Sequence, residues 1–249
     1  MSDSPAPSPT VPLIVDPPPA ARPTWHTWAE IILCSGYPTQ IMLGGVLMAV
    51  GINAVGPDNS LSPRFVFALS LLDTVLLLSL IVALLVRRGE RPLEVFFGGR
   101  PAFGEIAFGV MSVPVVLTVV LTLMVGIMRF APQLRNVPNN PLEGLLSGPA
   151  GIWLFLFVAI VAGGVREELQ RAFLLHRFKR DLDQPWMGLF ITSMAFGLGH
   201  TLQGNDAAII TGMLGAIWGA MYLIRGSALA SMVSHSLFNS AELLRIVLR

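Results

Sequence analysis

The chain has 249 residues, of which 53% are hydrophobic and only 12% are charged, and its formal net charge is +1. A soluble domain carries roughly 25% charged residues, so this composition excludes a soluble globular enzyme, a disordered chain and a nucleic-acid-binding protein. The natural solvent of such a chain is lipid. The single cysteine, Cys34, permits no internal disulfide and no cysteine-based metal cluster.

Residues 1–28 are rich in proline and contain no apolar run long enough for a signal peptide. We expect them to form a disordered or polyproline-like cytoplasmic tail. Trp25 and Trp28 are expected to anchor the first span at the membrane interface. Residues 29–249 are then the transmembrane domain.

Apolar segments follow along the rest of the chain, at about 30–54, 65–86, 105–130, 150–178, 187–203, 207–224 and 227–247. A membrane span needs about 20 apolar residues, so these segments use almost the whole chain. An eighth element, interfacial or re-entrant, could lie around residues 92–104. The sequence therefore predicts an all-α polytopic membrane bundle of seven to eight transmembrane helices, with any chemistry located among the helices.

Basic residues are distributed unevenly among the loops. They cluster after the second and fourth apolar segments and between the sixth and seventh, whereas the intervening loops hold only Arg64 and Arg135. This alternation predicts a cytoplasmic N-terminus. Because the chain is short and has no recognisable targeting signal, we expect an integral protein of the bacterial inner membrane.

An ionisable residue inside a span is costly and is therefore a functional candidate. Four polar residues stand out, because a rise of about 1.5 Å per residue places all of them near the middle of a hydrocarbon core roughly 30 Å thick. They are Glu167, His200, His235 and Asn239, on three different segments. The sequence predicts one buried polar site built from these segments.

Spacing along the helices suggests which polar residues pair. Glu167 and Arg171 are four residues apart, so they share a helix face and are expected to form an ion pair. Glu242 and Arg245 are three apart and are expected to form a structural or interfacial pair. Asp73 lies inside the second apolar segment and has no partner that the sequence identifies.

Three motifs carry these residues: Glu167-Glu168-Leu169-Gln170-Arg171, Phe196-Gly197-Leu198-Gly199-His200 and His235-Ser236-Leu237-Phe238-Asn239. In order and spacing they resemble the CAAX prenyl endopeptidase and bacteriocin-processing superfamily of intramembrane proteases, also called the CPBP or abortive-infection family. The motifs of that family are Glu-Glu-x-x-x-Arg, Phe-x-x-x-His and His-x-x-x-Asn. The resemblance covers about residues 150–245, which are expected to form the catalytic core.

The first motif departs from the family pattern, because Arg171 follows the second glutamate by three residues instead of four. If the glutamates are matched, one residue is missing. If the arginine is matched, Arg166 replaces the first family glutamate. Both Glu167 and Glu168 remain candidates for the catalytic base, and the four-residue spacing to Arg171 favours Glu167. By resemblance, Arg171 would hold the glutamate pair in place.

The resemblance implies an intramembrane endopeptidase that hydrolyses a peptide bond. A glutamate, Glu167 or Glu168, and His200 would activate a water molecule. His235 and Asn239 would donate hydrogen bonds to the oxyanion of the tetrahedral intermediate. The implied partners are a peptide or protein substrate and membrane lipids, with no nucleic acid; the sequence leaves open whether the substrate is prenylated.

Three alternatives stay open at this stage. Glu167, His200 and His235 also match the ligand set of some catalytic zinc sites, although the chain lacks the His-Glu-x-x-His helix, so a metal-free mechanism is favoured over a metalloendopeptidase. A catalytically silent membrane scaffold or immunity-type protein is a second reading of the altered motif. A proton-coupled transporter is the third, and the absence of an internal repeat disfavours it.

Overall fold

The computed structural model describes residues 24–56, 60–138, 140–146 and 148–248, so most of the predicted N-terminal tail lies outside the described residues. The described part is helical and contains no β-strand beyond one isolated bridge between Val55 and Leu61. The elements are α1 (Thr24–Leu33), α2 (Tyr37–Ala49), α3 (Pro63–Arg87), α4 (Pro92–Phe97), α5 (Ala102–Phe130), η1 (Pro132–Leu134), η2 (Pro141–Leu145), α6 (Gly148–Val158), η3 (Ala159–Arg166), α7 (Glu167–Arg180), α8 (Pro185–Leu198), η4 (Thr201–Gln203), α9 (Asn205–Arg225) and α10 (Leu229–Val247).

Several of these helices are suited to cross a membrane. By length and composition, four described helices qualify: α3, α5, the continuous run Gly148–Arg180 and α9. The pair α1 and α2, bent by 43°, makes a fifth if it counts as one span. The chain is therefore an all-α integral membrane protein, but the predicted count of seven to eight spans is not confirmed.

The difference from the predicted count has a physical origin. Each of the seven predicted segments does contain a helix, but α8 has only 14 residues and ends at Leu198, and α10 carries polar side chains along its length. Around residues 92–104, where an eighth element was expected, the chain forms the six-residue helix α4. The helix α1 begins at Thr24, so the last residues of the predicted tail are helical.

Local sequence signals explain several helix boundaries. Ser62 caps α3, because its hydroxyl accepts a hydrogen bond from the backbone N–H of Phe65 at 3.4 Å, and Pro63 occupies the first helical position. Gly226, at φ 66°, ends α9 in the left-handed conformation. Gly36, at φ 89°, makes the bend between α1 and α2.

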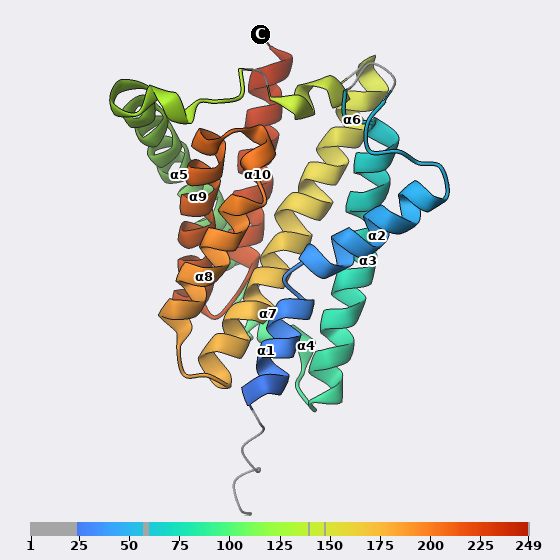
Figure 1. Ribbon diagram of the computed structural model, residues 1–249. Coiled ribbons are helices and arrows are strands. Elements are labelled where there is room, and N and C mark those ends of the chain that lie inside the picture. The colour runs from blue at the N-terminus through green and yellow to red at the C-terminus, as the bar shows by residue number, and fades with distance from the viewer. Residues whose placement is uncertain (1–23, 57–59, 139, 147, 249) are drawn as a thin grey trace, which may run out of the picture.

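The central element is the run of α6, η3 and α7, which Figure 1 shows passing from one end of the bundle to the other. Its middle part, η3, is a π-helix that ends at Arg166, directly before the two glutamates of the first motif. The π-helix packs against α10, and α7 packs against α8 and α9. These contacts bring the three motifs together.

Small residues allow the close contact between η3 and α10. A methyl group added to Gly164 would collide with Ser236, reaching its Cα at 3.0 Å. A methyl group added to Gly163 would lie 2.6 Å from Nδ2 of Asn239. Glycine at these positions therefore sets the distance between the two helices.

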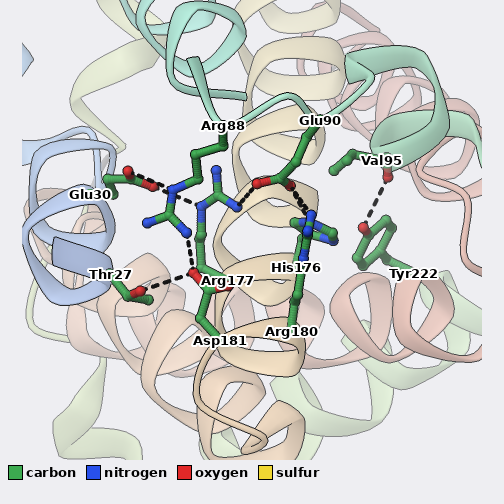
Figure 2. A network of polar contacts seen from close by, with 10 residues as sticks. All are labelled: Thr27, Glu30, Arg88, Glu90, Val95, His176, Arg177, Arg180, Asp181 and Tyr222. Carbon is green, nitrogen blue, oxygen red and sulfur yellow. Dashed lines mark hydrogen bonds and ion pairs between the residues drawn. The ribbon is translucent and has the colours of Figure 1, made fainter. Parts of the chain in front are cut away.

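At the lower end of the bundle in Figure 1, a network of ion pairs ties α1, the α3–α4 loop and α7 together (Figure 2). Its centre is Arg177, whose side chain is fully buried between two carboxylates, with Nε 2.8 Å from Glu30 and Nη1 2.6 Å from Glu90. Arg88 pairs with Glu30 at 2.9 Å and with Asp181 at 2.5 Å. The network joins the N-terminal part of the chain to the end of α7.

Glu90 has the most cationic surroundings in this network. His176 Nε2 and Arg177 Nη1 each lie 2.6 Å from its carboxylate, and Arg180 Nη1 lies at 3.0 Å. Burial acts to raise the pKa of Glu90, but the hydrogen bonds from His176 and Arg177 and the charge of Arg177 outweigh it and hold this pKa at about 2. Glu90 therefore stays ionised at any physiological pH.

Candidate active site

The two adjacent glutamates of the first motif have different environments. Glu168 is only 1% exposed, and its Oε1 accepts hydrogen bonds from the guanidinium of Arg171 and from Nδ1 of His235, the latter at 2.9 Å. The predicted pair of Glu167 with Arg171 is therefore wrong. Residues three apart are also neighbours on a helix, and Glu168 is the glutamate that forms a hydrogen bond with α10.

Glu167 is the more accessible of the two. Its side chain is 21% exposed and lines a cavity of about 280 Å³. Oε2 of Glu167 lies 3.9 Å from Nε2 of His235, so the imidazole of His235 lies between the two carboxylates. One glutamate is thus held in place by charge, and the other faces open space.

His200 lines the same cavity as Glu167. It follows the C-terminal end of α8, and its Nδ1 lies 2.8 Å from the carbonyl oxygen of Phe196. Because a carbonyl can only accept a hydrogen bond, Nδ1 carries the proton. A neutral His200 then has its lone pair on Nε2, where it can accept a proton or orient a water molecule.

The aromatic ring of Phe196, the first residue of the second motif, lies among the polar residues of the site. The guanidinium of Arg171 stacks over this ring at 4.6 Å, and the ring of His200 meets it edge to face at 4.8 Å. On the other side, Trp218 stacks on His235, with ring centroids 3.8 Å apart. No sequence pattern singled out Trp218, because it belongs to an ordinary apolar segment.

Asn239 lies on the far side of the site. Its Nδ2 donates a hydrogen bond to the carbonyl oxygen of Ala159, at the start of η3, at 3.1 Å. Neither Asn239 nor His235 lines the cavity that Glu167 and His200 share. Of the four residues predicted to converge, Glu167 and His200 thus line one cavity. His235 lies next to this cavity through its contacts with the two glutamates, and Asn239 is hydrogen-bonded to the backbone instead.

Sequence reasoning missed the partner of Asp73. The carboxylate of Asp73 forms a buried ion pair with Arg166 and also accepts a hydrogen bond from Nε2 of Gln40 at 3.3 Å. Arg166 lines the cavity beside Glu167. Two opposite charges inside apolar segments can indicate such an ion pair. Asp73 and Arg166 are 93 residues apart, however, so no local sequence pattern identifies them as partners.

The bend between α1 and α2 forms another wall of the cavity. Tyr37 donates its hydroxyl proton to the carbonyl oxygen of Ala195 on α8 at 2.6 Å. Gln170 donates from Nε2 to the carbonyl oxygen of Cys34 at 2.9 Å. Both residues line the cavity, so the N-terminal helices help to enclose the site.

The predicted zinc ligands do not form a metal site in this structure. Among the described residues, no group of three or more histidine, cysteine, aspartate or glutamate side chains could hold a metal ion. Nδ1 of His235 is bound by Glu168, and Nδ1 of His200 by a backbone carbonyl. These bonds leave Nε2 of both rings free and do not exclude a metal by themselves, but Glu167, His200 and His235 do not come together as a metal-binding group in the described part of the chain.

The remaining charged pair in the last segment is confirmed. Arg245 donates to Oε2 of Glu242 from Nη2 at 2.8 Å and from Nε at 3.0 Å. Both side chains are partly exposed, well away from the cavity lining. The pair forms as its spacing predicts.

Comparison with known protein families gives a match to the C-terminal part of the chain. Residues 149–241 match the model of the family described as type II CAAX prenyl endopeptidase Rce1-like. No curated protein and no solved structure matches the chain significantly. The matched segment contains all three motifs, and the match confirms the family resemblance that they predict.

Proposed function

Because residues 149–241 carry an Rce1-like domain, we propose that the protein is an intramembrane endopeptidase whose catalytic base is Glu167. One observation carries the proposal. Glu167 and His200, from the first two motifs, line a single cavity among the membrane helices. The adjacent Glu168 is already engaged by Arg171 and His235, which leaves Glu167 as the carboxylate that can reach a water molecule.

Peptide hydrolysis needs an activated water, a stabilised oxyanion and a proton for the leaving amine. In the proposed reaction a water molecule lies between Glu167 and Nε2 of His200. Glu167 takes its proton while the water oxygen bonds to the carbonyl carbon of the scissile peptide. When the C–N bond breaks, Glu167 returns the proton to the departing amine nitrogen.

The second glutamate has a positioning role. Oε1 of Glu168 accepts a hydrogen bond from the protonated Nδ1 of His235. This bond holds the imidazole ring with its Nε2 directed toward Glu167. A second proton on Nε2 would make His235 a donor to the oxyanion. The same role for Asn239 rests on the family resemblance, and requires its amide to leave the carbonyl of Ala159.

Two further assignments belong to this proposal. The network around Arg177 and Arg88 lies at the end of the bundle where basic residues gather, and we assign this end to the cytoplasm. The substrate is a peptide or protein that reaches the cavity from the membrane. Hydrolysis is proposed without a metal ion, and lipidation of the substrate is a question for the assay.

The proposal is tested by a cleavage assay on detergent-solubilised full-length protein, with a panel of fluorogenic peptides with and without prenyl groups. His200→Ala should abolish cleavage while the protein remains folded. His26→Ala is the matched control, since His26 is exposed and its one ring contact among the described residues is with Trp25, and it should cleave like the wild type. A chelator should leave the rate unchanged.

Undiminished cleavage by His200→Ala would overturn the assigned mechanism. If the wild type cleaves none of the peptides, and His200→Ala alters a cellular phenotype no more than His26→Ala does, the scaffold alternative is favoured.

A further inference from the structure

A second and larger cavity, of about 630 Å³, lies at the basic end of the bundle. Its walls come from the α3–α4 loop, α4, α7 and α9, and it shares no lining residue with the candidate active site. Its polar lining consists of Glu90, Arg91, Glu94, His176, Lys179 and Arg180. Cavities of this volume are typical of ligand sites.

The negative charge of Glu90 is not available to a ligand. Its carboxylate is buried, and it already contacts His176, Arg177 and Arg180 (Figure 2). Within the described residues Arg180 makes one ion pair, the 3.0 Å contact to Glu90, and 55% of its side chain is exposed. The guanidinium of Arg180 therefore retains donors that can face the cavity.

Two more cations line the cavity with little or no compensation. Lys179 is exposed and forms no ion pair within the part of the chain that the structure describes. Arg91 pairs with Glu94, but 81% of the Arg91 side chain is exposed, and such a surface pair is weak. Since Glu94 is the only other acid in the lining, the cavity has an excess of positive charge even with a neutral His176.

The cavity also lies at the ends of the membrane helices, the level at which a bilayer has its lipid head groups. The membrane helices α3, α7 and α9 all end at this level, next to α4 (Figure 1). The remaining wall is apolar, and includes Val95, Leu223 and the ring of Tyr222, whose hydroxyl is already bonded to the Val95 carbonyl at 3.0 Å (Figure 2). A polar basin beside an apolar wall suits a ligand with an anionic head and an apolar tail.

We propose that this cavity binds a phosphate-bearing anion through Arg91, Lys179 and Arg180, with the head group of an anionic lipid as its source. Basic pockets between the cytoplasmic ends of membrane helices are known to take such head groups. The occupant would cover the open side of the Glu90 network. The inference does not depend on the proposed peptidase activity, because it uses none of the residues of the active site.

The test is a titration of the detergent-solubilised full chain with phosphatidylglycerol, with phosphatidylcholine and with inorganic phosphate, monitored by the thermal unfolding temperature. Phosphatidylglycerol should stabilise the wild type more than phosphatidylcholine does. Lys179→Gln should weaken the apparent affinity about fivefold, and Arg91→Gln/Lys179→Gln about 25-fold. Neither substitution removes a contact of Glu90.

Arg87→Gln is the matched control. Arg87 is exposed at the same end of the bundle and carries the same charge, but it does not line the cavity, so its variant should bind phosphatidylglycerol like the wild type. Stabilisation by inorganic phosphate that the double variant loses would support the site and identify soluble phosphate as its source. Equal responses to the two lipids with no response to phosphate, or equal losses in Arg87→Gln and Lys179→Gln, would overturn the proposal.

Discussion

His235 and Glu168 are 67 positions apart in the chain, and Nδ1 of His235 donates to Oε1 of Glu168 at 2.9 Å. This bond joins α10 to α7 within the bundle. Together with Arg171 it engages one glutamate of an adjacent pair and leaves Glu167 facing the cavity. The proposed division of roles between the two glutamates rests on this contact.

Substitution of the two glutamates should therefore affect the stability of the protein to different extents. Glu168→Gln leaves Arg171 and His235 buried without their anion, which should cost about 3–5 kcal/mol of stability. Glu167→Gln removes a partly exposed carboxylate, and should change stability by less than about 1 kcal/mol while it slows cleavage by about 10²–10⁴-fold. Thermal unfolding in detergent measures the stability of both variants. A greater loss of stability in Glu167→Gln than in Glu168→Gln would contradict the assignment.

The buried pair of Asp73 and Arg166 should show strong coupling. Asp73→Asn alone leaves the Arg166 guanidinium without an anion and should destabilise the protein by about 3–5 kcal/mol. Arg166→Gln in the same chain removes that uncompensated charge, so the double variant should be more stable than Asp73→Asn. A double-mutant cycle on the free energy of unfolding checks this, and strictly additive effects would show that the pair contributes nothing.

The Glu90 network should make stability depend on acid pH. The pKa of Glu90 in the folded protein, about 2, lies below the ordinary value of 4.5. The stabilisation that ionised Glu90 contributes is therefore complete above pH 4.5 and disappears as the pH falls toward 2. The unfolding temperature of the wild type should therefore decrease more steeply over this interval than that of Glu90→Gln. Glu94→Gln, at an exposed pair, should follow the wild-type curve; identical slopes for all three proteins would refute the prediction.

The contact between η3 and α10 predicts a strong effect of a single methyl group. Gly164→Ala would force Ser236 away and should cost about 1–3 kcal/mol through overpacking. Gly126→Ala in α5 is the matched control, because nothing lies within 4 Å of the added methyl, and it should be neutral or stabilising by about 0.5–1 kcal/mol. Equal unfolding temperatures for the two variants would show that this contact is not tight.

Several features of the molecule could be predicted from the sequence because they depend on local patterns. Hydropathy identified the apolar helices and the membrane class, and the spacing of Glu242 and Arg245 identified their ion pair. The three motifs predicted the family that residues 149–241 match. Their order also placed Glu167 and His200 on the elements that line one cavity.

Other features depend on tertiary contacts that local patterns do not contain. Spacing allowed Arg171 to pair with either glutamate, and the position of His235 decides the choice in favour of Glu168. The pair of Asp73 and Arg166 needs the packing of α3 against the central helix. Hydropathy also cannot show that η3 is a π-helix, whose wider turn changes the direction in which the side chains of α7 point relative to those of α6.

The central claim is that Glu167 is the base, and its most direct test is the cleavage rate of Glu167→Gln under single-turnover conditions, compared with the wild type at equal folded fractions. The account predicts a decrease of about 10²–10⁴-fold, the usual contribution of a positioned base, with an unfolding temperature close to that of the wild type. A wild-type rate in Glu167→Gln would contradict the account.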